Sequence, residues 1–473
     1  MNTKIYNSPF GKRYGSKEML YNFSPKKKYS TWRKLWLSLA EAQKQLGLNI
    51  SEKQIKELKN NLYNINFERV SYYEKKFHHD VMAHIYALGE ICPLSRPIIH
   101  LGATSAFVKD NTELIQIRDG MEILLKKIIN IIRNFKKFCI KYKNTPTLGF
   151  THYQPAQVTT VGKRATLWLQ SLLLDLKTLN FRLKNLPFRG VKGAIGTAES
   201  FKKLFNGDFK KIQKLEKIIC KNFNFKKVFS VTGQTYDRKI DSQILNLLSG
   251  IAQSAHKFTN DLRLLQNLKE IEEDFEKEQI GSSIMAYKRN PIKSERIASL
   301  SKYVISLENS SAIVSATQWL ERTLDDSANK RLVLSQSFIC VDYILLIWNN
   351  ILNGLRVNTK IINKNLKNEL PFMITEFIIS EIVKNGGDRQ KIHERIRIHS
   401  MNTFKKNIIN GKKNDFIKRI LNDKEIPIDK KKIYTLLKPK NLKGFAREQT
   451  SEFLKKEVNP ILKKYSYIKN IDS

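Results

Sequence analysis

A polar, cationic segment at residues 281–296 reads GSSIMAYKRNPIKSER and is a candidate for acid–base chemistry. Its glycine and its Asn-Pro pair favour a loop, and Pro291 suits the first turn of the helix that follows. A helix N-terminus presents free N–H groups and the positive end of the helix dipole, so it favours an anion. A serine that acts as a base must be deprotonated, and Lys288 together with this helix end would favour the ionised form of Ser282. The alternative is a solvated basic loop whose serines satisfy backbone groups.

Two histidines lie in contexts that suit proton transfer. His152 follows Thr151 between two prolines, in a break between long helical patterns, and His79 lies between His78 and Asp80. Histidine titrates near neutral pH, so an accessible ring can donate or accept a proton. Taken alone, either histidine is more often a surface or capping residue.

A third candidate set lies in the stretch ERTLDDSANKR. Arg322, Ser327 and Arg331 place two guanidiniums and a hydroxyl near a predicted helix start. Arginine offers forked N–H donors that match a phosphate group. The alternative is a charged helix face on which the arginines pair with Asp325 and Asp326.

Other patterns that could carry chemistry are weak. The acidic run at 270–278 (EIEEDFEKE) has no metal-ligand spacing, and a solvated helix face explains it better. The chain contains no HExxH or CxxC spacing and no glycine-rich phosphate loop after a strand. Its four cysteines lie far apart, which is typical of reduced, buried thiols in a cytosolic protein.

The formal net charge of +40 would attract polyanions and could indicate a nucleic-acid binder. The lysines are scattered along the whole chain beside many Asn and Ile residues, so an AT-rich coding sequence explains the charge equally well. No apolar stretch reaches the ~20 residues of a membrane span. The segment 338–347 comes closest and contains Asp342, and the N-terminus lacks the apolar region of a signal peptide. We therefore expect a cytoplasmic protein without membrane contact, and we do not expect nucleic-acid binding.

Long segments with apolar residues every three or four positions must hold these motifs in place. They cover 31–46, a helix capped by Ser51, a helix of ~30 residues that Asp110 and Asn111 would cap, 169–176, 240–265, the segment after Pro291, and 327–355. No βα alternation of a parallel sheet is present. The pattern predicts an all-α protein built on a helical bundle, with the motifs in loops at the helix ends.

Taken together, these stretches resemble the adenylosuccinate lyase family of the fumarase/aspartase superfamily, and specifically its animal-like branch. The superfamily signature GSSxMPxKxNP is matched here by GSSIMAYKRNP. The branch-level resemblance covers nearly the whole chain and includes TWRKLWLSLAEAQKQLGL, HDVMAH, IIHLGATS, PTLGFTHYQPAQ, TTVGKR, FRGVKGAIGT, TGQTYDRK, QWLERTLDDSANKR, ELPFMITE and NGGDRQKIHERIR.

The resemblance implies three mostly helical domains, at 1–104, 105–357 and 358–473, the second being a long helical bundle. It implies a homotetramer whose active sites are each built from three subunits. It implies no metal and no organic cofactor. Breaks near 104 and 356 in the helical patterns agree with these boundaries.

The resemblance also implies a reaction: β-elimination of fumarate from adenylosuccinate, giving AMP, and from succinylaminoimidazole carboxamide ribotide. Ser282 would remove the Cβ proton, His152 would protonate the leaving nitrogen, and Glu295 would orient it. His79 and Lys288 match further catalytic positions. The implied substrate contacts are Lys288 and Asn290 for the succinyl carboxylates, Arg13, Tyr14, Arg322, Ser327 and Arg331 for the nucleotide and its phosphate, and His78, His79, Asp80, Thr104, Ser105, Thr151, Gln234 and Arg296 elsewhere.

Two residues depart from the family pattern. Ala286 replaces the signature proline, which removes a fixed φ and predicts a slower or less ordered loop closure. His78 stands where the branch usually has arginine, so a permanent charge becomes a titratable one. We expect the KM for substrate to rise above neutral pH. A KM that stays flat from about pH 6 to about 8.5 contradicts this prediction.

Two other functions compete with this one. A superfamily lyase acting on argininosuccinate should lack both the phosphate set Arg322, Ser327 and Arg331 and the TGQTY stretch, and this chain has both. A nucleic-acid-binding protein on a decayed enzyme scaffold would explain the charge, but it would not need to keep the predicted catalytic residues. Steeply salt-dependent RNA binding without lyase activity would favour it.

Overall fold

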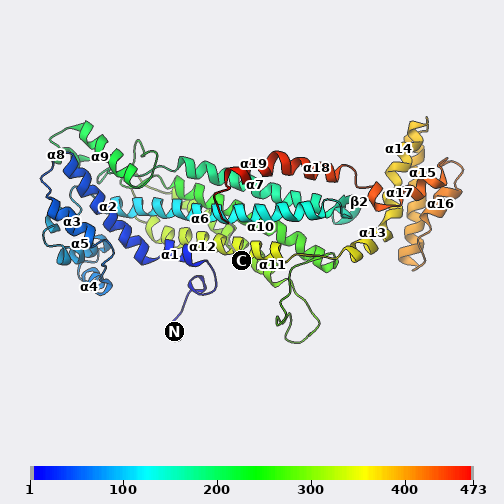
Figure 1. The fold of residues 1–473 in the computed structure, drawn as a ribbon, viewed down its shortest axis with the longest axis horizontal. Coiled ribbons are helices and arrows are strands. Elements are labelled where there is room, and N and C mark those ends of the chain that lie inside the picture. Colours follow the sequence, from blue (N-terminus) through cyan, green and yellow to red (C-terminus); the bar gives the residue numbers. More distant parts are fainter. Residues whose placement is uncertain (1–4, 470–473) are drawn as a thin grey trace. The chain divides into compact units, whose positions relative to one another are not determined.

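The computed structural model describes residues 5–469, and these are mostly helical (Figure 1). They form two compact units, each assembled from three stretches of chain. The first unit contains the described part of Met1–Ile128 with Leu173–His256 and Arg296–Trp348. The second contains Ile129–Leu172, Lys257–Glu295 and the described part of Asn349–Ser473. The all-α prediction is confirmed, whereas the three-domain division at 104 and 357 stays a prediction.

Five long helices contribute residues to both units: α6 (Ser105–Tyr142), α7 (Val161–Asn185), α10 (Lys239–Asn267), α11 (Ile292–Ala316) and α12 (Asp326–Gly354). The shorter helices of the first unit are α1 (Lys17–Asn22), α2 (Pro25–Gln45), α3 (Glu52–Asn60), α4 (Phe67–Phe77), α5 (Asp80–Ile91), α8 (Glu199–Leu204) and α9 (Phe209–Asn222), with 3₁₀ turns at Pro9–Gly11 and Arg96–Ile98. All the predicted long helices are present.

The second unit adds strands β1 (Pro146–Thr151), β2 (Gln154–Thr160), β3 (Ile271–Glu272) and β4 (Arg356–Val357). Its own helices are α13 (Thr359–Met373), α14 (Thr375–Lys384), α15 (Arg389–Phe404), α16 (Phe416–Asn422), α17 (Lys430–Leu436), α18 (Ala446–Phe453) and α19 (Asn459–Lys464), with π turns at Lys405–Ile409 and Leu454–Val458 and a 3₁₀ turn at Pro439–Asn441. Helices α13 to α17 enclose a separate apolar core that includes Ile374, Ile378, Ile392, Phe416 and Ile433.

The capping predictions had different outcomes. Ser51 caps α3 as expected: its hydroxyl accepts the Gln54 N–H, and the Gln54 side chain accepts the Ser51 N–H at 2.9 Å. The prediction that Asp110 and Asn111 cap α6 is wrong, because α6 begins at Ser105 and both side chains are buried within it. Their side chains contact other buried groups and do not cap free N–H groups at a helix end.

Helix α12 is long and apolar enough to cross a membrane by length and composition, but 72% of its most apolar window is buried. Its one acidic residue in that apolar stretch, Asp342, is fully buried and pairs with Lys127 of α6. The Asp342 carboxylate also accepts the Ser16 N–H at 2.7 Å. These contacts are those of a core helix in a globular unit.

This buried pair gives a stability prediction. Asp342→Asn removes the buried counter-charge of Lys127 and leaves it only the exposed Glu18 carboxylate at 3.3 Å, so we expect the free energy of unfolding to fall by about 2–3 kcal/mol. Urea denaturation monitored by circular dichroism measures it. The double variant Lys127→Met/Asp342→Leu removes both charges and is expected to recover most of the loss. A single-variant change below about 1 kcal/mol contradicts the prediction.

In the second unit, α6, α7 and α10 pack through Phe135, Trp168 and Phe258, whose ring centroids lie 5.2–6.5 Å apart. The break predicted between α6 and α7 is present, but it is an antiparallel hairpin, β1–β2, and not an irregular loop. Arg164 of α7 donates to the Leu148 carbonyl of β1, which ties the hairpin to the helix that follows it. The hairpin is the element that carries His152.

Candidate active site

The predicted site residues are distributed over both units, and each group is described within its own unit. The first unit carries Arg13, Tyr14, His78, His79, Asp80, Thr104, Ser105, Gln234, Arg296, Arg322, Ser327 and Arg331; the second carries Thr151, His152, Ser282, Lys288, Asn290 and Glu295.

His152 occupies the tip of the β1–β2 hairpin. Thr151 pairs with Gln154, so His152 and Tyr153 form a two-residue turn, and both have positive φ values, 51° and 58°. Such a type I′ turn favours Asn-Gly, so two bulky residues here hold a strained backbone of the kind concentrated at functional sites. His152 is exposed, which leaves its ring free to meet a substrate.

The Ser282 hydroxyl lies in a small nest of backbone donors. Its Oγ accepts N–H groups of Ile284 at 3.4 Å and Met285 at 3.1 Å. Hydrogen bonds to the charged form of an acid favour ionisation, so this geometry suits a serine that loses its proton. A Cβ at Gly281 would lie 2.0 Å from the Lys288 carbonyl oxygen, so the close chain crossing that shapes the loop requires glycine.

Asn290 ties this loop together, because its Nδ2 donates to the Gly281 carbonyl at 2.7 Å. Lys288 is exposed on the same loop and is free to turn toward an anion. Glu295 is exposed in the first turn of α11, one turn beyond Pro291, whose carbonyl accepts its N–H. The loop and the helix start therefore lie together as predicted.

The departure at Ala286 has a local setting. Lys288 N–H donates to the Met285 carbonyl at 3.0 Å, which closes a β-turn with Ala286 at its second position. Proline is favoured at that position because its fixed φ matches the turn. Alanine in place of proline therefore leaves the folded turn intact, but it gives the loop more conformational freedom when the turn is not formed.

We expect Ala286→Pro to stabilise the ordered form of this loop by about 0.4–1 kcal/mol. We also expect it to raise kcat by up to about threefold. Limited proteolysis of the loop and steady-state kinetics measure the two effects. Serine at the same position is the control, since it leaves φ free. Unchanged proteolysis together with unchanged kcat would show that loop order does not limit the enzyme.

The acidic run before the loop is not a solvated helix face, and that interpretation is wrong. Glu270 and Glu273 are buried. Glu273 accepts the N–H groups of Lys293 and Ser294, both at 2.9 Å, and so caps α11. Burial raises the pKa of Glu273 although these donors oppose it. The run holds the helix start that follows Ser282.

In the first unit, His79 caps α5 beside Ser105, the first residue of α6. Its Nδ1 accepts the Met82 N–H at 3.2 Å, so the neutral ring carries its proton on Nε2, which lies 3.4 Å from the Ser105 hydroxyl. Asp80 pairs with Lys109 at 2.8 Å. Burial alone would raise the pKa of Asp80, but the hydrogen bond and charge of Lys109 hold it below its ordinary value. His78 is the exposed, left-handed residue that ends α4, with φ 52°.

Two other histidines of this unit, the buried His84 and the half-buried His100, are unsuited to proton transfer. Burial lowers the pKa of His84 to about 3 and that of His100 to about 4. The Trp36 indole donates to His100 Nδ1 at 2.8 Å. Both rings are therefore neutral structural groups, which distinguishes them from the exposed His79 and His152.

An aromatic cluster holds the predicted N-terminal contacts. The Tyr14 ring lies 5.3 Å from Tyr343 of α12, and Tyr343 accepts a hydrogen bond from Arg296 at 3.5 Å. Arg13 precedes Tyr14 and is exposed. The Thr104 hydroxyl, just before α6, is buried and has no hydrogen-bond partner among residues 5–469.

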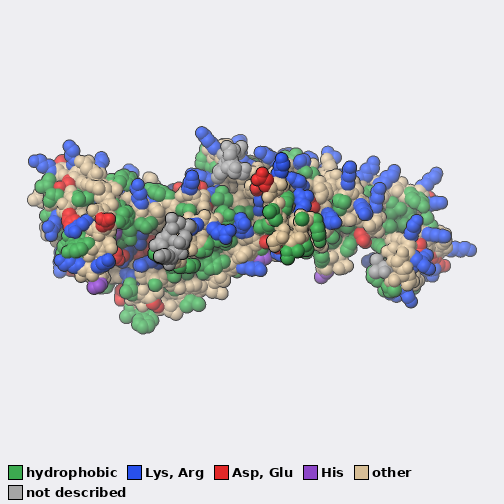
Figure 2. All heavy atoms as spheres, turned by 90° about the horizontal axis from the view of Figure 1, so that it is seen from below, with side chains coloured by type: hydrophobic (Ala, Val, Ile, Leu, Met, Phe, Trp, Pro, Cys, Tyr) green, Lys and Arg blue, Asp and Glu red, His purple; other side chains and the backbone are tan. Residues whose placement is uncertain are grey.

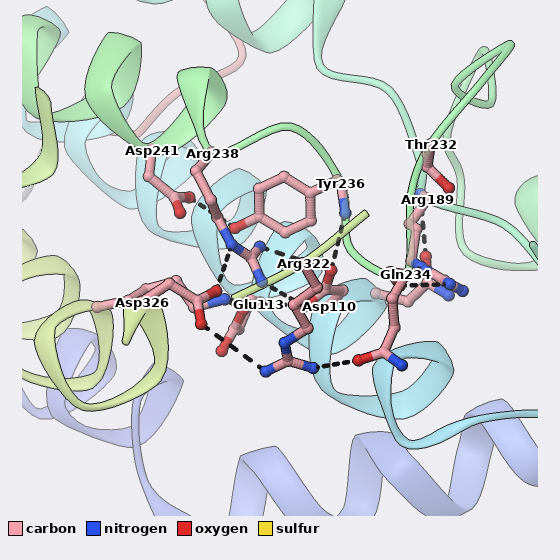
Figure 3. Close-up of polar contacts among 12 residues, drawn as sticks. Asp110, Glu113, Arg189, Thr232, Gln234, Tyr236, Arg238, Asp241, Arg322 and Asp326 are labelled. Carbon is pink, nitrogen blue, oxygen red and sulfur yellow. Dashed lines mark hydrogen bonds and ion pairs between the residues drawn. The ribbon is translucent and has the colours of Figure 1, made fainter. Parts of the chain in front are cut away.

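The predicted phosphate set lies at the start of α12 in the sequence, and Figure 3 shows its first member, Arg322, with the polar groups around it. Arg322 Nη1 donates to Gln234 Oε1 at 2.8 Å, and its Nη2 lies 3.8 Å from Asp326 Oδ1. Ser327 and Arg331 follow in the first turns of α12 and are four residues apart, hence on one helix face. The Arg322 guanidinium thus faces Asp326, as the charged-face alternative predicts, and the phosphate-binding role of the set stays a prediction.

No group of three or more His, Cys, Asp and Glu side chains able to hold a metal ion occurs within residues 5–469. The expectation that the chain needs no metal or cofactor stays a prediction.

Comparison with known proteins agrees with the motifs. The family model described as Lyase matches residues 12–306, and the one described as Adenylosuccinate lyase C-terminus matches residues 371–453. The adenylosuccinate lyase of Saccharomyces cerevisiae is 45% identical over 463 residues, covering 97% of this chain and 96% of that protein. The chain belongs to the adenylosuccinate lyase family. The family member of Schizosaccharomyces pombe is 46% identical over 460 residues, covering 97% and 95%.

Two solved structures share the fold of this adenylosuccinate lyase family member. A fumarate lyase from Mesorhizobium aligns with a TM-score of 0.81 at 19% identity, covering 96% of this chain and 100% of that one. The 3-carboxy-cis,cis-muconate lactonizing enzyme from Pseudomonas putida aligns with a TM-score of 0.82 at 18% identity, covering 96% and 99%.

Sequence reasoning missed several residues that this adenylosuccinate lyase family member places beside the predicted ones. Lys109 is one helical turn beyond Ser105, a spacing that could have indicated it. Burial lowers the pKa of Lys28, while the charge on Glu113 raises it and that on Arg331 lowers it, which locates Lys28 near the phosphate set. The contact of Asp326 with Arg238 joins residues 88 positions apart, and no local pattern could have found it.

Proposed function

We propose that this chain cleaves adenylosuccinate to AMP and fumarate, and cleaves succinylaminoimidazole carboxamide ribotide by the same β-elimination. The family membership and the Ser282 loop support this assignment. Its central observation is that the Ser282 hydroxyl accepts two backbone N–H groups, an arrangement suited to the ionised form of a serine base.

Ser282 removes a proton from the Cβ atom of the succinyl group. The negative charge that develops passes into the adjacent carboxylate, where Lys288 and the amide of Asn290 stabilise it. The C–N bond then breaks, fumarate leaves, and His152 gives a proton to the departing nitrogen. Glu295 orients the proton donor. His79, with its proton on Nε2, binds the substrate as a hydrogen-bond donor.

The nucleotide is held by its phosphate. Arg322 and Arg331 supply charged N–H donors, and Ser327 adds a hydroxyl in the first turn of α12, where the helix dipole favours an anion. Arg13, Tyr14, Asp80, Thr104, Ser105, Thr151, Gln234 and Arg296 provide the remaining contacts, with His78 in place of the usual arginine.

We further propose a homotetramer whose active sites combine residues from different subunits. Helix α7 exposes Leu167, Leu174 and Phe181, each more than half exposed and spaced seven residues apart. Such an apolar stripe is typical of helices that pack against a partner. The exposure of His152 at a hairpin tip is consistent with a site completed by another copy.

Nucleic-acid binding is less well supported. Figure 2 shows Lys and Arg side chains spread over the visible face and not gathered into one patch. The four cysteines are buried free thiols, which suits a reducing compartment, and we place the protein in the cytoplasm.

The test of the proposed function is a turnover assay with purified protein and adenylosuccinate. We expect loss of adenylosuccinate with equal release of AMP and fumarate, and release about 10³-fold slower by the Ser282→Ala variant. Absence of turnover by the intact wild-type oligomer would reject the assignment, and RNA binding in varied salt would then be measured.

A further inference from the structure

A buried network of charged side chains lies next to Arg322 (Figure 3). Arg238 is fully buried between two carboxylates. Its Nε donates to Asp326 Oδ2 at 2.6 Å, and its Nη2 donates to Asp110 Oδ1 at 3.2 Å. The Tyr236 ring packs against the guanidinium at 4.5 Å. The Asp326 carboxylate is therefore fixed from one side and cannot turn away.

The other oxygen of this carboxylate is unused. Asp326 Oδ1 is buried and accepts no hydrogen bond from any residue in 5–469, yet it lies 3.8 Å from Arg322 Nη2. A buried carboxylate oxygen without a donor is costly and calls for an explanation. Arg322 Nε is likewise buried without an acceptor in the described chain, so the guanidinium is held incompletely.

The present partner of Arg322 is Gln234, through the 2.8 Å hydrogen bond to Oε1. Under the proposed function, both Arg322 and Gln234 contact the substrate. The Gln234 carbonyl holds only Nη1, so its NH₂ group can donate to substrate while this bond is kept, and Nη2 has no hydrogen-bond acceptor of its own among residues 5–469. The guanidinium therefore needs a second acceptor, for Nη2, and the Asp326 Oδ1 atom is positioned to supply it.

We propose that Asp326 is the positioning residue of the phosphate-binding arginine: its Oδ1 accepts Arg322 Nη2 when phosphate is bound, while Gln234 holds Nη1. Arg238 and Asp110 anchor Asp326 for this role. A movement of about 1 Å brings the 3.8 Å separation into hydrogen-bond range. The inference rests on the proposed function, since it assumes a nucleotide phosphate at Arg322.

The test compares Asp326→Asn with Asp325→Asn. Asp325 is the exposed neighbour, and its carboxylate accepts a hydrogen bond from the Gln318 side chain at 3.2 Å, so its variant removes the same charge next to the same helix start. For Asp326→Asn we expect KM for adenylosuccinate to rise about tenfold or more with kcat changed less than about threefold. Asp325→Asn should change neither. With the substrate that lacks the 5′-phosphate, Asp326→Asn should match the wild type.

A merely structural role of Asp326 predicts a different result: a lower melting temperature and equal losses with the phosphorylated and the unphosphorylated substrate. That result, or an unchanged KM, overturns the proposal. Adding Arg322→Met to Asp326→Asn provides a cycle, in which the effect of Asp326→Asn on KM should vanish. Wild-type protein without turnover would instead reject the proposed function.

A second measurement does not require Asp326→Asn to fold. Gln234→Ala leaves Arg322 with Asp326 as its remaining partner, so the rise in melting temperature caused by inorganic phosphate should persist. Loss of that rise in Gln234→Ala would show that Gln234 alone holds the arginine, and would overturn the inference.

Discussion

Ser282→Ala is expected to lower kcat by about 10³-fold, because the variant loses the only group proposed to remove the Cβ proton. KM should change little, since the carboxylate and phosphate contacts remain. Steady-state release of fumarate measures both. AMP should still raise the melting temperature of the variant, which would show that the nucleotide site is intact.

Ser283→Ala is the matched control, because Ser283 is adjacent, exposed and in the same loop. We expect its kcat to stay within about threefold of the wild type. A loss of less than about tenfold in Ser282→Ala would assign the base to another residue. Similar losses in both variants would instead indicate a general disturbance of the loop.

His152→Gln is expected to lower kcat by about 10²-fold, because the departing nitrogen must then take its proton from water. Glutamine is similar in length and keeps a polar tip on the hairpin. The loss should be smaller with a substrate whose leaving group is a weaker base. Equal losses with all leaving groups would contradict a role as the general acid.

The His152→Gln variant also tests whether each active site combines residues of different subunits. If Ser282 and His152 of one active site come from different subunits, a mixture of Ser282→Ala and His152→Gln chains forms some sites with both native residues. With random reassembly, about a quarter of the sites should be native. Activity should therefore rise by well over tenfold when the two variants are unfolded together and refolded. A mixture no more active than its components would place both residues in one subunit.

The long helices and the residue types of the site were predictable, because helical periodicity is local and the loop motifs stand out from it. Ser51 shows this: its capping box is written in four consecutive residues. Asp110 shows the limit. Its type and place suggested a cap, but its partner Arg238 is 128 positions away, and only the folded chain reveals that pairing.

The hairpin illustrates a second limit. Two prolines and a glycine indicated a break, yet the β1–β2 pairing depends on contacts with neighbouring elements that local propensity does not contain. The prediction of a solvated helix face for the acidic run 270–278 was wrong for the same reason. Glu273 caps α11, which begins about twenty residues later, by accepting the N–H groups of Lys293 and Ser294, so its burial could not be predicted from its charged neighbours.

The hairpin that carries His152 also limits which changes of sequence length this segment can accept. Its turn has two residues, and its register shifts once, between Gly149 and Phe150. Because successive residues of a strand point to opposite faces, adding or deleting one residue between the shift and the turn would reverse the side on which the histidine emerges. Substitutions along the hairpin keep its register and can therefore be tolerated. Changes of its length alter the register and cannot. Insertions and deletions should be strongly counter-selected between residues 146 and 160, and more readily accepted in exposed surface loops elsewhere in the chain.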